Sequence, residues 1–71
     1  MDRIAVTSSS IASAGYSPEK STLEVEYCNG SVYQYFAVPK SVFDSLLAAA
    51  SKGTFVSQRI RGRYPYRRVA R

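Results

Sequence analysis

Residues 22–38 read TLEVEYCNGSVYQYFAV, the clearest structural pattern in the chain. The first six residues alternate in polarity, which places Leu23, Val25 and Tyr27 on one side of a strand. Asn29 and Gly30 then form a strong hairpin signal, because both residue types tolerate a positive φ. The β-branched and aromatic residues that follow favour a second strand. The stretch therefore predicts an antiparallel β-hairpin.

The register of this hairpin has two alternatives. A two-residue turn would place Tyr33 opposite Glu26 and leave Tyr33 and Tyr35 exposed beside carboxylates. A bulged turn would place Tyr33 opposite Val25, and both tyrosines would join the core. A one-residue slip exchanges the two faces of a strand, so the register decides between an exposed stacking or interaction face and ordinary sheet packing. The sequence favours packing.

Before the hairpin, residues 10–16 predict a first strand, and residues 17–20 predict a turn because proline follows serine there. Residues 1–10 form a polar lead-in that is predicted as a loop.

After the hairpin, residues 39–50 predict a helix that starts near a proline and carries an apolar stripe, and Gly53 is expected to stop it. Residues 54–61 favour a second short helix, with Thr54 as N-cap and Gly62 closing it. The alternative for this segment is an extended chain.

These elements predict one α+β domain over residues 1–71. A small antiparallel sheet of about three strands is covered by one main helix, and a short second helix and an extended basic C-terminal segment follow. A single cysteine, Cys28, excludes an internal disulfide. Since no run approaches the ~20 apolar residues of a membrane span, a cytoplasmic location is expected.

The positive charge of the chain is concentrated at one end. Residues 52–71, here called the basic segment, contain seven Lys or Arg and no acid. The preceding 51 residues contain three bases against five acids, a balance of −2, although the whole chain has a net charge of +5. Such sorting of charge along a chain indicates attraction to an anionic partner.

Catalysis and metal binding find little support in the residue types. The chain has no histidine, so the commonest general base is missing, and Cys28 has no base beside it in the sequence. Glu24 and Glu26 share one face of a strand, which is typical of its solvated side. Zinc sites prefer clusters of cysteine and histidine. We therefore expect no enzyme, no cofactor and no metal site.

Arginines interleaved with tyrosines favour nucleic acid, because guanidinium groups fork onto phosphates and flat rings stack on bases. Tyr64 and Tyr66 are the stacking candidates of the basic segment, since neither has a glutamate beside it in sequence. Binding through four or five phosphates would give a log–log salt slope of roughly −3. The predicted RNA-binding residues are Arg59, Arg61, Arg63, Tyr64, Tyr66, Arg67 and Arg68.

A series of short motifs extends over residues 9–69. They are SIA (10–12), GY (15–16), LEVE (23–26), NG (29–30), YQYF (33–36), VP (38–39), KG (52–53), IR (60–61) and YPY (64–66). In this order and spacing the chain resembles the KTSC domain family, a module named from the C-terminus of some lysyl-tRNA synthetases that also occurs as a small free-standing bacterial protein.

The resemblance implies a bacterial, cytoplasmic setting and RNA rather than DNA as the partner. It supplies no catalytic or binding residues, and the family has no established activity. The alternative function is a protein–protein interaction module that docks a partner through an exposed sheet edge or through the face of Tyr33 and Tyr35.

Overall fold

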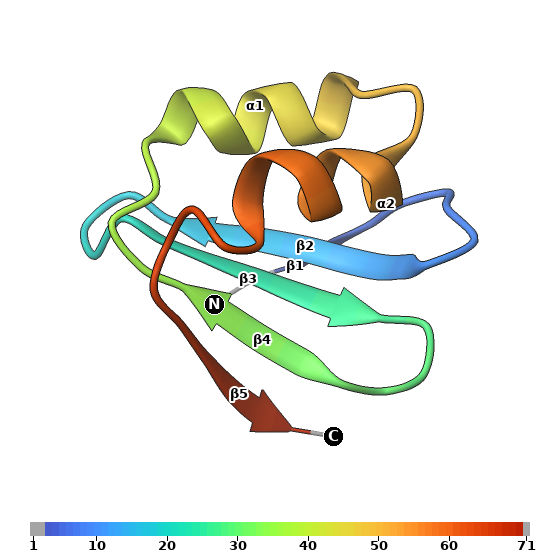
Figure 1. The fold of residues 1–71 in the computed structure, drawn as a ribbon, viewed down its shortest axis with the longest axis horizontal. Helices are drawn as coiled ribbons and strands as arrows, with labels where there is room; N and C mark the ends of the chain where they lie inside the picture. Colours follow the sequence, from blue (N-terminus) through green and yellow to red (C-terminus); the bar gives the residue numbers. More distant parts are fainter. Residues whose placement is uncertain (1–2, 71) are drawn as a thin grey trace.

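Five antiparallel strands follow one another across a sheet in chain order in the computed structural model, which describes residues 3–70 (Figure 1). Two helical segments lie together on one face of this sheet. The strands are β1 (Arg3–Ala5), β2 (Ile11–Ser17), β3 (Thr22–Tyr27), β4 (Val32–Tyr35) and β5 (Tyr66–Ala70); the helical segments are α1 (Lys40–Ala48) and α2 (Lys52–Phe55), which continues as a π-helical turn, η1 (Val56–Ile60).

The α+β class and the antiparallel sheet are confirmed, but the expected count of about three strands is too low. The three expected strands are β2, β3 and β4, and the sheet gains an edge strand on each side. β1 lies in the lead-in that was predicted as a loop, whose residues 1–2 are outside the described part. Its three residues are all exposed, so they carry no alternating pattern, and pairing with β2 holds the strand in place.

The β3–β4 hairpin adopts the second of the two registers, in which Val25 pairs with Tyr33 and Leu23 with Tyr35. The turn explains the choice. The Tyr27 amide donates to the Ser31 carbonyl over 2.8 Å, and Gly30 has a φ of 92°. A three-residue loop whose last residue is left-handed produces a bulge and shifts the register by one residue. Both tyrosines therefore face the helices.

We expect Gly30→Ala to destabilise the domain by about 1 to 2 kcal/mol, because a side chain at positive φ brings Cβ against the following carbonyl. Gly30→Asn is the matched control and should cost less, since Asn tolerates the left-handed region. Urea denaturation of the three proteins measures both values. Equal stability of the Ala variant and the wild type would contradict the turn described here.

The core lies between the sheet and the helices. Phe43 and Leu46 from the apolar stripe of α1 are buried, as are Val56 and Ile60 from η1. The Tyr16 ring stacks on Phe43 with ring centroids 5.5 Å apart, which ties α1 to β2. The buried hydrophobic residues are Ile11, Ala14, Leu23, Val25, Val32, Tyr35, Val38, Phe43, Leu46, Val56 and Ile60.

The boundaries of the helices differ from the expected ones. The first helix ends at Ala48, before the chain becomes extended at Ala49, and Gly53 lies inside the second helix instead of stopping the first. The N-cap is Ser51 and not Thr54, because the Ser51 hydroxyl accepts the Thr54 amide over 3.4 Å. The helical alternative for this segment is confirmed, but the helical residues are 52–60, and Arg61 is extended.

The face of the sheet away from the helices is polar. Glu24 accepts a hydrogen bond from the Gln34 amide over 2.9 Å and forms an ion pair with Arg3 over 3.1 Å. Glu26 accepts a hydrogen bond from the Ser13 hydroxyl over 2.8 Å. Both glutamates thus lie on this face, as predicted, and the sheet separates them from the tyrosines.

Candidate functional site

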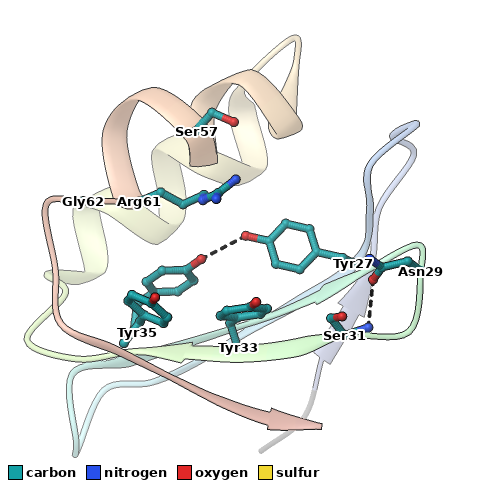
Figure 2. Close-up of a pocket in the computed structure, with 9 residues that line it drawn as sticks. Tyr27, Asn29, Ser31, Tyr33, Tyr35, Ser57, Arg61 and Gly62 are labelled. Carbon is teal, nitrogen blue, oxygen red and sulfur yellow. Dashed lines mark hydrogen bonds between the residues drawn. The ribbon is translucent and has the colours of Figure 1, made fainter. Parts of the chain in front are cut away.

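A groove of about 650 Å³ opens on the helix side of the sheet, beside the end of η1 (Figure 2). Its floor is aromatic, and its upper wall comes from the helical segment and the turn that follows. The lining residues are Tyr27, Tyr33, Tyr35 and Tyr66 from the strands, Asn29 and Ser31 from the β3–β4 turn, and Ser57, Arg61 and Gly62 from η1 and the turn after it.

The tyrosines come together because of strand alternation and register. Tyr33 and Tyr35 are two residues apart on β4 and therefore share a face. Tyr35 pairs with Tyr66 on the neighbouring strand β5. Tyr27 ends β3 on the face of Leu23, which is the same side of the sheet. Three strands thus contribute rings to one patch.

The rings contact one another around Tyr33. Its centroid is 6.3 Å from that of Tyr35 with an angle of 18° between the planes, and 5.6 Å from that of Tyr66 with an angle of 38°. Tyr27 meets Tyr33 edge-on at 5.5 Å. These separations are those of favourable aromatic pairs. Tyr35 is 2% exposed and Tyr66 is 60% exposed, so the patch extends from the core to the solvent-exposed surface.

A pair of phenol groups closes the inner end of the floor. The Tyr27 and Tyr35 hydroxyl oxygens are 2.9 Å apart and hydrogen-bonded (Figure 2). Burial raises the pKa of Tyr35, the hydrogen bond with Tyr27 raises it further, and the positive charge of Arg61 acts in the opposite direction. Tyr35 is therefore a neutral phenol at physiological pH.

Arg61 extends over this floor from the end of η1 (Figure 2). Its amide donates to the Val56 carbonyl over 2.8 Å, the bond that closes the π-helical turn. Gly62 follows with a φ of 78°, a left-handed conformation that glycine adopts without steric cost. Backbone geometry thus fixes the origin of the Arg61 side chain above the rings.

The structure distributes the predicted RNA-binding residues over three surfaces. Arg61 and Tyr66 line the tyrosine groove, and Arg68 pairs with Tyr33 on the same side of the sheet. Arg67 pairs with Gln34, so strand alternation directs it to the opposite, polar face. The basic segment therefore does not form one continuous cationic surface.

The third surface is a second groove, of about 310 Å³, between α1 and the end of the second helical segment. Arg59, Arg63 and Tyr64 line it, together with residues of α1. Tyr64 is half-buried and lies outside the aromatic patch. Of the two stacking candidates in the basic segment, only Tyr66 reaches the tyrosine groove.

The acidic side chains in the described part of the chain do not pair with these arginines. Glu24 and Glu26 are engaged on the polar face, and Asp44 forms an ion pair with Lys40 over 3.1 Å. Within residues 3–70, no salt bridge involves an arginine of the basic segment. Their charges are therefore available to an external anion.

Five residues of the tyrosine groove were not predicted from the sequence as functional residues. Tyr27 could have been found, because the TLEVEY alternation puts it on the apolar face and the bulged register brings Tyr33 to the same side. No local signal marks the others as site residues, since the folded turn and the helix end bring them to the groove. The five residues are Tyr27, Asn29, Ser31, Ser57 and Gly62.

Cys28 lies exposed near the tip of the β3–β4 turn as a free thiol. Its Sγ is 3.9 Å from the Ser8 carbonyl oxygen, and it has no other hydrogen-bond partner in the described part of the chain. The described residues contain no cluster of three potential metal-ligating His, Cys, Asp or Glu side chains. None of their helices is long and apolar enough to cross a membrane.

The fold and the groove together define a small α+β module with an antiparallel meander, a helical layer on one face and a tyrosine patch at the margin of that layer. The KTSC domain family matches residues 7–64, and the chain belongs to this family. The solved structure of a KTSC domain protein from Yersinia pestis superimposes with a TM-score of 0.90 at 36% identity, covering 96% of each chain.

Similar sequences occur in two kinds of protein. An uncharacterized protein from Stutzerimonas stutzeri is 48% identical over 58 residues, covering 82% of each chain. A protein from Tsukamurella paurometabola is 44% identical over 59 residues, 83% of this chain and 88% of its own. A lysine–tRNA ligase from a Nostoc species is 38% identical over 55 residues, 78% of this chain but 10% of the ligase.

Proposed function

We propose that this domain binds single-stranded RNA in the tyrosine groove as an accessory, non-catalytic module. The observation that carries the proposal is the aromatic floor with an arginine above it, Arg61, that forms no salt bridge within residues 3–70. Tyr33 and Tyr66 provide ring faces for bases, and Arg61 and Arg68 provide guanidinium groups for phosphates. These are the two kinds of contact that hold single strands without reading their sequence.

The register removes an objection to stacking on these rings. Had Tyr33 paired with Glu26, carboxylates beside the rings would have repelled phosphate. Instead, Glu24 and Glu26 lie on the polar face with their own partners. The electrostatic field above the floor is therefore set by Arg61 and Arg68, and neither Glu24 nor Glu26 lies on that side of the sheet.

The relatives support RNA over other polyanions. The matched region of the Nostoc protein is part of a lysine–tRNA ligase, whose name specifies a tRNA substrate. A domain joined to such an enzyme lies in the same chain as a tRNA-binding protein, which supports RNA as the anionic partner proposed for this chain.

The salt dependence of binding tests the role of Arg61. We expect a trinucleotide to bind with a log–log salt slope of roughly −1.4, two phosphate contacts at about −0.7 each, and Arg61→Gln to reduce it to about −0.7. The chain has six Tyr and no Trp, so quenching of tyrosine fluorescence reports ring stacking without a label.

Arg67→Gln is the matched control, because it removes the same charge from the polar face. It should leave the slope unchanged. Equal slopes for Arg61→Gln and the wild type, or absence of binding at low salt, would overturn the proposal.

A protein-interaction role is the second candidate, and the exposed strand β5 favours it. β5 is an edge strand whose Tyr66 and Val69 are 60% and 42% exposed. An extended peptide could add to this edge through main-chain hydrogen bonds. Pull-down of a partner that depends on Val69, which is exposed on β5, but hardly on salt would favour this role over RNA.

A further inference from the structure

The second groove combines an aromatic floor with arginines at its rim, as the tyrosine groove does. Val42, Phe55 and Tyr64 are half-buried and pack against the core, so they form an apolar and partly aromatic floor. Arg59 and Arg63 stand exposed at its rim. Ring faces beside guanidinium groups suit a nucleotide with its phosphate, as in the tyrosine groove.

The rim is polar on the α1 side as well. Ser41 and Ser45 are one helical turn apart and line the groove with their neighbour Val42, so their hydroxyls are available to a phosphate oxygen. Asp44 is the acid nearest to them in sequence, and its charge is offset by the ion pair with Lys40.

Arg63 is held in place by the protein. Its Nε donates to the Gln58 carbonyl over 3.1 Å, and its amide donates to the Ile60 carbonyl over 3.1 Å. The two terminal nitrogens of the guanidinium remain for a ligand. An arginine anchored in this way loses less side-chain freedom when it binds an anion.

Residues 57–63 line both grooves and form the ridge between them. Ser57 and Arg61 face the tyrosine groove, whereas Arg59 and Arg63 face the second groove, so a single segment supplies arginines to both. Arg61 and Arg63 are two residues apart, which places their Cα atoms within about 7 Å of each other. An RNA strand bound at Arg61 can therefore also reach Arg63.

We propose that the second groove is a further subsite for the same RNA strand, with Arg59 and Arg63 on phosphates and Tyr64 on a base. The inference rests on the proposed function of the tyrosine groove. It defines a path for the RNA strand that runs from the tyrosines past Arg61 to the groove between α1 and the end of η1.

Oligonucleotides of two lengths separate this subsite from the first one. An octanucleotide should bind the wild type with a salt slope of roughly −2.8, four contacts at about −0.7 each, against roughly −1.4 for a trinucleotide. In the double variant Arg59→Gln/Arg63→Gln, the octanucleotide slope should fall to that of the trinucleotide. Trinucleotide binding should not change.

The control is Lys20→Gln/Arg67→Gln, which removes the same charge away from both grooves and should keep the wild-type slopes. Arg63→Lys keeps the charge without the fork and should retain most of the octanucleotide slope. Circular dichroism establishes that each variant is folded.

Two results would overturn the inference in different ways. If the double variant binds the octanucleotide like the wild type, the second groove is not used, while the tyrosine groove still stands. If the wild type binds neither oligonucleotide, the proposed function fails and the subsite fails with it.

Discussion

Tyr66→Ala is expected to weaken RNA binding about 5- to 150-fold, since stacking of a base on an aromatic side chain is worth about 1–3 kcal/mol by alanine substitution. Tyr66 is the most accessible ring of the patch, at 60% exposure, and its centroid is 5.6 Å from that of Tyr33. A base entering from solvent meets this ring first. Tyrosine fluorescence titration with a trinucleotide measures the loss.

Two further substitutions distinguish stacking from general apolar contact. Tyr66→Phe keeps the ring and should bind within a factor of about two of the wild type, because every base stacks on any flat aromatic face. Tyr66→Leu keeps apolar volume without a ring and should behave like Tyr66→Ala. If the Leu variant binds as well as the Phe variant, bases do not stack at this position.

Leu46→Ala is expected to lower the free energy of unfolding by about 2–5 kcal/mol, through lost burial and the cavity left behind. Leu46 is 0% exposed and lies in the core between α1 and the sheet. The total stability of a domain of this size is roughly 4 to 11 kcal/mol, at about 0.05–0.15 kcal/mol per residue. The substitution thus removes a large part of it, and urea denaturation measures the change.

Leu47→Ala is the matched control, because it makes the same change on the same helix at a half-buried position. It should cost clearly less than Leu46→Ala. Leu46→Met, which nearly conserves volume, should cost less than about 1.5 kcal/mol. Equal losses at the two leucines would contradict the orientation of α1 described above.

The central part of the fold could be predicted because its signals are local. The alternation of residues 22–27 and the turn at Asn29 and Gly30 are sufficient for the hairpin, and the apolar stripe is sufficient for the main helix. β1 could not be predicted, since three exposed residues carry no periodicity and are held by pairing with β2. The start of the second helix depends on whether a serine or a threonine is its N-cap. In the structure the N-cap is Ser51, whose hydroxyl accepts the Thr54 amide.

The site was predictable only in part, for a different reason. The sequence identified Arg61, Tyr66 and the tyrosines of β4, but not their arrangement. The register of the hairpin depends on whether Gly30 alone is left-handed, and that one conformation moves both β4 tyrosines to the helix side. The separation of Arg61 from Arg59 and Arg67 follows from helix and strand geometry that composition does not contain.

The most direct test of the RNA proposal is an aromatic nuclear magnetic resonance spectrum of the domain, recorded during titration with a trinucleotide. We expect the ring signals of Tyr33 and Tyr66 to shift first and together, while those of Tyr16, which stacks on Phe43, stay unchanged. Shifts confined to residues outside the tyrosine groove, or no shifts at low salt, would contradict it.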